Sequence, residues 1–310
     1  RAVGENRIPL LCLAVAVILN IFLDILFVHT FSMGLRGAAH ATNIAQCIAG
    51  VLCMAYLLFR FRELVPKGQE WQMQRRKYQE MTIFGISLGM MSCFVSIGTV
   101  IFQTAVNRLG TKIVTAHIAA RRIEELTNVP MLCTGMAMTT YASQNLGAGE
   151  YDRIKKGIHQ AFVIVLVQGV IFTTFCWIFG HPLIRWITSS NDTYILDTAY
   201  RYLTRNTSFY FVLGPLFVLR CSLQGLEHKV IPVASSILEL VLKIVSTIWI
   251  VPVLGYTGVI YTEPIIWIFM TLMRIGGYVR ALKQINEAEH IKSARNAKAE
   301  NEKINVDNRL

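Results

Sequence analysis

Long apolar segments separated by short polar loops set the pattern of this chain. Crossing the hydrocarbon core of a bilayer takes about 20 helical residues, and eight segments are long enough. They cover residues 8–31, 36–60, 81–106, 112–141, 154–179, 197–224, 230–252 and 257–281. The sixth contains Gly214 and Pro215, where we expect a kink. The pattern predicts an all-α polytopic membrane protein with eight transmembrane helices.

Composition and charge support the same fold class. The chain is 54% hydrophobic and 16% charged, with a formal net charge of +11. Its basic residues gather in alternate loops, such as 60–80 and the stretch around Arg153, as is typical of cytosolic loops. This distribution argues against nucleic-acid binding. It predicts a multi-pass protein of the plasma membrane with both ends cytosolic and a polar tail, 282–310, that is disordered or loosely helical.

Polar side chains interrupt the first two apolar segments. Asn20 and Asp24 are four apart and share a helix face, and Thr42 and Gln46 are four apart on the returning segment. Counted from the turn at 33–37, they lie at matched depth, roughly 10 Å below one membrane surface. An antiparallel hairpin then places Asp24 beside Thr42 and Asn20 beside Gln46. A carboxylate at that depth indicates a functional site; the alternative is a structural hydrogen-bond cluster between the two helices.

The first two segments also resemble the last two. Each pair has an Ile-Pro at its start and a Gly-x-x-Gly turn before its second helix: Ile8-Pro9 with Gly34 and Gly37, and Ile231-Pro232 with Gly255 and Gly258. Parallel repeats of this kind build secondary transporters. We therefore expect 1–60 to be the last two helices of a first six-helix lobe, 61–80 a cytosolic amphipathic loop, and 81–281 a complete second lobe. On this interpretation the chain is a fragment that lacks four helices upstream.

Six segments, in order, resemble the multidrug and toxic compound extrusion (MATE) transporters. They read GENRIPLLCL (4–13), NIFLDILFV (20–28), GLRGAAHAT (34–42), SQNLGAGEYDRIKKGI (143–158), SLQGLEHKVIPV (222–233) and GYTGVIYTEPIIWI (255–268). The resemblance covers residues 1–281. It implies a twelve-helix, two-lobe antiporter that exports amphipathic, often cationic, small molecules against inward Na⁺ or H⁺. No cofactor other than the coupling ion is expected, and we expect a monomer in the lipid bilayer.

The resemblance also implies a cation site. Several members use an Asp from the first helix, an Asn and an Asp four apart on the fifth, and a Thr on the sixth. Asn20, Asp24 and Thr42 match the last three and would be metal ligands if the coupling ion is Na⁺. Other members place an acidic residue on the seventh helix, whose equivalent, 81–106, has none and offers only Gln103. This departure favours the first-lobe hairpin as the cation site.

Further charged residues lie inside the later segments. Arg121 and Glu124 are three apart and Arg121 and Glu125 four apart, so these side chains either neutralise one another or serve a cavity that binds cationic drugs or relays protons. Glu239 lies four residues before Lys243, which favours a structural ion pair over a drug contact. One further carboxylate, at Glu263, precedes a proline and is expected to brace the helix start.

The candidate cavity or proton-relay residues are Gln46, Gln103, Arg121, Glu124, Glu239 and Glu263. The leading function is a secondary active multidrug exporter. A lipid-linked oligosaccharide flippase of the same fold superfamily is the alternative, and a positively charged cavity would favour it. A fragment that is inactive on its own is another. An integral-membrane enzyme is disfavoured because the histidines are scattered and no catalytic pair shares a depth.

Overall fold

The computed structural model describes residues 7–62, 75–228 and 230–307, with side chains described as far as residue 287. Within these ranges every regular element is a helix. The elements are α1 (Arg7–Asp24), η1 (Ile25–Thr30), α2 (Gly34–Arg60), α3 (Arg75–Asn107), α4 (Thr111–Ala148), α5 (Tyr151–Thr188), α6 (Thr193–Thr207), α7 (Tyr210–Gly225), α8 (Val230–Val245), η4 (Ser246–Ile250), α9 (Val251–Leu254) and α10 (Tyr256–Asp307).

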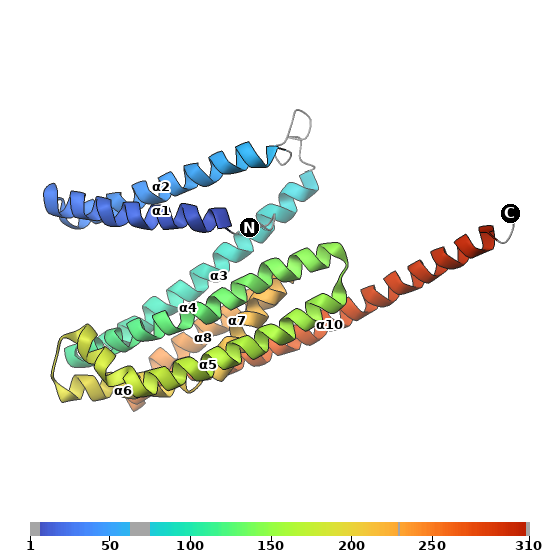
Figure 1. The fold of residues 1–310 in the computed structure, drawn as a ribbon. Coiled ribbons are helices and arrows are strands. Elements are labelled where there is room, and N and C mark those ends of the chain that lie inside the picture. Colours follow the sequence, from blue (N-terminus) through green and yellow to red (C-terminus); the bar gives the residue numbers. More distant parts are fainter. Residues whose placement is uncertain (1–6, 63–74, 229, 308–310) are drawn as a thin grey trace. The chain divides into compact units, whose positions relative to one another are not determined.

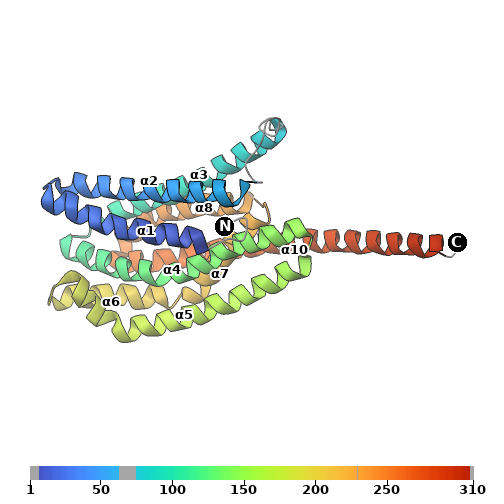
Figure 2. The same ribbon diagram turned by 45° about the horizontal axis from the view of Figure 1, so that its top comes forward.

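The chain divides into two units, residues 1–80 and 81–310. In the first unit, α1 and α2 run antiparallel and side by side (Figure 1 and Figure 2). In the second unit, α4 packs against α5, α6 and α7, and α10 packs against α7 and α8. Three clusters of buried apolar side chains lie within this bundle, one of them centred on Tyr202 and Leu203 and another on Tyr210 and Trp267.

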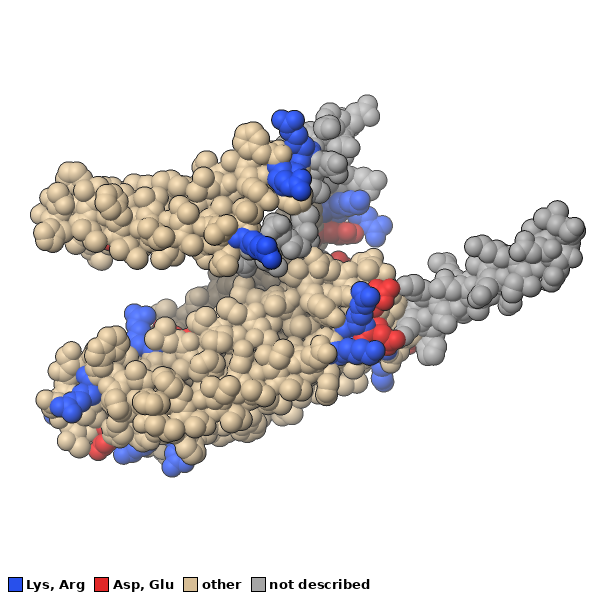
Figure 3. All heavy atoms as spheres, in the orientation of Figure 1, with Lys and Arg blue, Asp and Glu red and all other residues tan. Residues whose placement is uncertain are grey.

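Six of the described helical segments are long and apolar enough to cross a membrane. They are Arg7–Thr30, Gly34–Arg60, Arg75–Asn107, Tyr151–Thr188, Val230–Leu254 and Tyr256–Glu287. On the face shown in Figure 3, Lys and Arg side chains gather toward the helix ends and leave the middle of the helices uncharged. This arrangement matches a bilayer with polar surfaces on either side of a hydrocarbon core. The protein is a multi-pass membrane protein.

The predicted sixth segment is not one helix kinked at Gly214 and Pro215. It is divided into α6 and α7 at Ser208 and Phe209, and Pro215 lies inside α7. The Ser208 hydroxyl donates to the Thr204 carbonyl at 2.7 Å, and the Phe209 N–H donates to the carbonyl three residues back at 2.9 Å. The break therefore lies before the proline, at two residues whose hydrogen bonds run to Thr204 and Asn206.

Two π-helical turns interrupt the membrane helices. One, η1, directly follows α1, and the other, η4, directly follows α8. Each π turn lies within an antiparallel pair of helices; we call Arg7–Arg60 the first hairpin and Val230–Glu287 the second hairpin. Single π turns inside α-helices occur frequently at functional sites, so both hairpins are candidates for one.

The ends of several helices are fixed by local polar contacts. Asp192 caps α6 by accepting the Tyr194 N–H at 3.0 Å. Lys112 at the start of α4 donates to the same carboxylate at 2.7 Å, which lowers the pKa of Asp192 below its usual range. Gly149, with φ +69°, ends α4 in the helix-to-helix turn.

The two connecting regions differ in what the structure describes. Most of the predicted amphipathic loop, residues 63–74, lies outside the described residues. In the tail, α10 continues as a helix to Asp307, so the backbone of 282–307 is helical.

Candidate functional site

The first hairpin brings three of the predicted cation-site residues onto facing surfaces. The Asn20 amide Nδ2 donates to the Thr42 hydroxyl at 3.4 Å, and that hydroxyl donates to the Ala38 carbonyl at 3.0 Å. One turn along, the Oδ1 atom of Asp24 is buried and has no hydrogen-bond partner among the described residues. Burying a carboxylate oxygen without a hydrogen-bond donor is costly unless another group, such as a bound cation, satisfies it. The Oδ1 atom of Asp24 is therefore the candidate cation ligand of this hairpin.

One pairing in the hairpin differs from the predicted one. Asn20 bonds to Thr42, a pairing that was not predicted, and its predicted neighbour Gln46 is exposed; the contact of Asp24 with Thr42 stays a prediction. The prediction assumed an uninterrupted α-helix between Asp24 and the turn. Because η1 begins directly after Asp24, its wider hydrogen-bonded rings shift the register of the residues that precede it.

In the second unit, buried charged side chains from several helices form one network. Glu124 of α4 accepts hydrogen bonds from Arg121 at 3.3 Å and from the Tyr202 hydroxyl of α6 at 3.1 Å. Arg121 reaches Glu263 of α10 at 4.0 Å, and Lys243 of α8 reaches the same carboxylate at 3.5 Å. Ion pairs and one tyrosine hydrogen bond therefore link α4, α6, α8 and α10.

Lys243 closes the other end of this network. Its ammonium lies 2.9 Å from Glu239 and donates to the Thr99 hydroxyl of α3 at 3.2 Å. Lys243, Glu124, Glu239 and Glu263 are each less than 10% exposed. The network thus contains three carboxylates and two cationic side chains. If all are ionised, it carries one excess negative charge, which is costly because the groups are buried.

Several predicted pairings can be compared with this network. The Glu239–Lys243 and Arg121–Glu124 pairs are confirmed. The structure shows no Arg121–Glu125 pair; Glu125 instead pairs with Arg122 at 3.4 Å, with both side chains more than half exposed. Because exposed pairs of this kind contribute little, Glu125 stands apart from the network.

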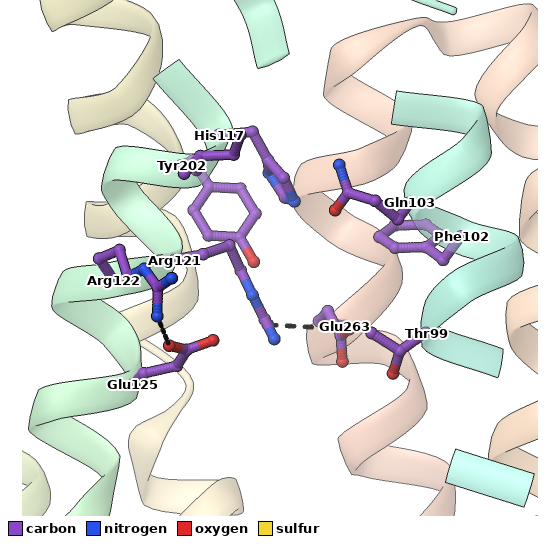
Figure 4. Close-up of a pocket in the computed structure, with 10 residues that line it drawn as sticks. Thr99, Phe102, Gln103, His117, Arg121, Arg122, Glu125, Tyr202 and Glu263 are labelled. Carbon is purple, nitrogen blue, oxygen red and sulfur yellow. Dashed lines mark hydrogen bonds and ion pairs between the residues drawn. The ribbon is translucent and has the colours of Figure 1, made fainter. Parts of the chain in front are cut away.

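A cavity of about 220 Å³ opens beside Arg121 and Glu263. Figure 4 shows the Arg121 guanidinium reaching across it toward Glu263. The other polar lining residues are Thr99, Gln103, His117, Arg122, Glu125 and Tyr202. Drug-sized ligands occupy about 300–1,000 Å³, so in this conformation the cavity suits an ion or a small polar group. Its lining carries both acidic and basic side chains, so it lacks the positive character that would favour the flippase alternative.

Sequence reasoning missed the members contributed by other helices. Tyr202 and Thr99 carry no spacing relation to the charged residues they approach, whereas His117 lies four residues before Arg121 on α4, a spacing that could have revealed it. His117 is buried, with its ring 4.9 Å from that of Tyr202 in an edge-on arrangement. Gln103, a candidate cavity residue, lines the cavity and donates to Asn107 at 3.0 Å. Only the fold brings Tyr202 and Thr99 to the network.

The fold and site define a class of protein: a polytopic membrane protein with paired helical hairpins and buried ionisable groups inside the bilayer, as in secondary transporters. Residues 88–249 match the MatE family model. The chain belongs to the MATE family, whose members are membrane transporters rather than enzymes.

Relatives and solved structures agree with this assignment. The chain is 27% identical over 253 residues to the probable multidrug resistance protein YpnP of Bacillus subtilis, a match over 81% of this chain and 54% of that protein. It is 28% identical over 200 residues to the probable multidrug resistance protein NorM of Thermotoga maritima, covering 61% of this chain and 41% of that protein.

The fold is also that of solved MATE structures. A crystal structure of MATE in complex with MaL6 superposes with a TM-score of 0.78 at 21% identity, covering 90% of this chain and 63% of that chain. The protein thus has a MATE-like helical fold. The chain spans about half the length of the curated relatives it matches.

Proposed function

We propose that the protein is a secondary active exporter of amphipathic, often cationic, compounds, driven by inward Na⁺ or H⁺. Family membership and the printed names of the bacterial relatives support multidrug efflux. In this proposal eight membrane spans form the last two helices of a first lobe and the six helices of a second. The protein acts as a monomer in the cytoplasmic membrane, and its C-terminus is cytosolic.

The observation that carries the coupling assignment is the buried, unpartnered Oδ1 of Asp24. Asn20 and Thr42 supply neutral oxygen atoms on the facing surfaces of the same hairpin. A carboxylate with neutral oxygens is the ligand type that hard cations prefer. If Na⁺ is the coupling ion, these residues are its metal ligands; if H⁺ is, Asp24 carries the proton.

The network of the second unit is the second coupling candidate. Its three buried carboxylates and two cations leave room for one additional positive charge, which a proton supplies. Its members are Arg121, Lys243, Glu124, Glu239 and Glu263, and Gln103 lines the cavity beside Arg121 and Glu263. This observation favours a proton relay there.

One experiment separates the two coupling sites. Efflux of a fluorescent cation from vesicles is measured with full-length wild type, Asp24→Asn and a matched control, Asp197→Asn, whose carboxylate is exposed. Separate Na⁺ and pH gradients drive transport. We expect Asp24→Asn to abolish coupled efflux while the control retains it.

Two outcomes count against the assignment. Unchanged efflux in Asp24→Asn under both gradients would exclude Asp24 as the coupling residue. Loss of Na⁺-driven efflux with intact pH-driven efflux would move proton coupling to the network of Glu124 and Glu263.

A further inference from the structure

The two hairpins share turn geometry as well as a sequence pattern. In each, the first glycine of the turn has a left-handed φ, +57° at Gly34 and +56° at Gly255. In each, the second glycine packs against the π-turn region. A Cβ on Gly37 would lie 3.1 Å from the Phe27 carbonyl carbon, and a Cβ on Gly258 would lie 3.3 Å from that of Ile250.

These contacts fix the register between the copies. Ile250 lies 223 positions after Phe27, and Gly258 lies 221 positions after Gly37. The first helices therefore correspond at an offset of 223 and the second helices at 221, because the second turn is two residues shorter. The Ile-Pro starts, 8-9 and 231-232, also lie 223 positions apart.

With these offsets, the polar residues of the first hairpin correspond to charged residues of the second. Asn20 corresponds to Lys243, and Thr42 corresponds to Glu263. Each pair is in contact across its own hairpin, at 3.4 Å for the neutral pair and 3.5 Å for the charged pair. The contact is kept between the copies, while an amide and a hydroxyl in one become an ammonium and a carboxylate in the other.

A further position corresponds in the same way. Asp24 corresponds to Thr247, and both Asp24 Oδ1 and Thr247 Oγ1 are buried atoms without a hydrogen-bond partner among the described residues. Each hairpin thus keeps a polar oxygen next to its pair. In the first hairpin no cationic side chain forms an ion pair with Asp24 within the described part of the chain.

The second hairpin has a place built for the lysine ammonium. Lys243 Nζ lies 2.9 Å from Glu239, 3.2 Å from Thr99 and 3.5 Å from Glu263, so oxygen atoms from three helices surround it. The lysine side chain is 4% exposed. Gly98 on α3 makes room for it, since a Cβ there would lie 3.1 Å from Lys243 Cδ.

We propose that Lys243 is a tethered cation that fills, in the second hairpin, the position that the coupling ion occupies in the first. This inference rests on the proposed function of Asn20, Asp24 and Thr42. It implies that the second hairpin is a permanently occupied copy of the cation site and that transport is coupled through the first hairpin. Removing the ammonium turns the second hairpin into a site for a free monovalent metal cation, with Glu263 and Glu239 as ligands.

The test measures Na⁺-dependent thermal stability of the full-length protein in detergent, with choline chloride as the ionic-strength control. The Asp24→Asn background silences the first hairpin. In that background, Lys243→Asn introduces the residue found at position 20, and Lys243→Arg keeps a tethered charge. A third variant, Lys243→Asn with Glu239→Gln, leaves one carboxylate, as in the first hairpin, and avoids two buried like charges if the single change folds poorly.

We expect Na⁺ to raise the Tm of the Lys243→Asn variants by on the order of a few degrees at saturation and to leave Lys243→Arg unchanged. A folded Lys243→Asn or Lys243→Asn/Glu239→Gln protein with no Na⁺-specific shift would overturn the proposal. A different result would show that the first hairpin is not the cation site: the Asp24→Asn single variant would then keep the Na⁺-dependent Tm shift of the wild type.

Discussion

Arg274 gives the sharpest stability prediction in the second unit. The guanidinium on α10 is 0% exposed and donates to the Ser235 hydroxyl of α8 through Nε at 3.1 Å and Nη2 at 2.9 Å. Its Nη1 donates to the Leu216 carbonyl of α7 at 3.0 Å. No carboxylate forms an ion pair with Arg274 among the described residues, so a single hydroxyl satisfies two of its donors.

Ser235→Ala removes that hydroxyl and leaves two buried, charged N–H groups without an acceptor. An unsatisfied buried donor costs about 1–3 kcal/mol, more when it is charged, so we expect Ser235→Ala to lower the free energy of unfolding by about 3 kcal/mol. Arg274→Met removes the charge together with its desolvation cost. Because apolar replacement of a buried charge is often close to neutral, we expect it to cost about 1 kcal/mol.

The assay is reversible unfolding in mixed micelles of the single variants and the Ser235→Ala/Arg274→Met double variant. The double variant should be no less stable than Arg274→Met alone, which gives a coupling energy of about 2–3 kcal/mol. Ser236→Ala is the matched control, because that buried hydroxyl donates to the Pro232 carbonyl at 3.2 Å and makes no bond to Arg274. Additive effects in the double variant, or equal losses in Ser235→Ala and Ser236→Ala, would refute the reasoning.

Two further predictions concern packing and pH. A Cβ on Gly225 would lie 2.5 Å from the Thr139 carbonyl oxygen, so Gly225→Ala forces α7 away from α4 and should cost about 1–3 kcal/mol in micelle unfolding; Gly276→Ala, with open space around the added Cβ, is the control and should be near neutral. Equal Tm values for the two variants would contradict this. Because the Lys112 ammonium holds the pKa of Asp192 below its usual range, the carboxylate contributes stability above its ordinary pKa of about 4, and that contribution is lost as pH falls through the lower folded-state value. Asp192→Asn should therefore reduce the fall of Tm at acid pH, and the difference from wild type should be smaller in high salt. A steeper fall of Tm in Asp192→Asn would contradict a stabilising Lys112–Asp192 pair.

Sequence spacing predicted the features that depend on residues within a single helix. The apolar blocks predicted the membrane helices, and spacing of three and four predicted Arg121–Glu124 and Glu239–Lys243. The Gly-x-x-Gly repeat predicted two similar hairpins. These succeed because hydrophobic length and i,i+4 proximity are properties of the chain alone.

What the sequence did not predict depends on packing between helices or on departures from α geometry. Tyr202 and Thr99 join the charged network from other helices, with no spacing to reveal them. The break lies at Ser208 and Phe209, ahead of the proline on which the prediction of a kink rested. The bond from Asn20 to Thr42 was not predicted, because depth was counted at a uniform α-helical rise that the π turn after Asp24 interrupts.

The π turn of the first hairpin also bears on how such proteins diverge. A π turn holds one more residue than the α turn it replaces, so deletion of one residue within Ile25–Thr30 would restore the α-helix. Because the π turn already absorbs the extra residue, the preceding helix would keep nearly the same face toward α2, and Asn20 would stay on the side of Thr42. A one-residue gap in the middle of an aligned membrane helix, ordinarily dismissed as misalignment, would here mark a transporter that has lost the π turn and kept the orientation of its candidate cation site.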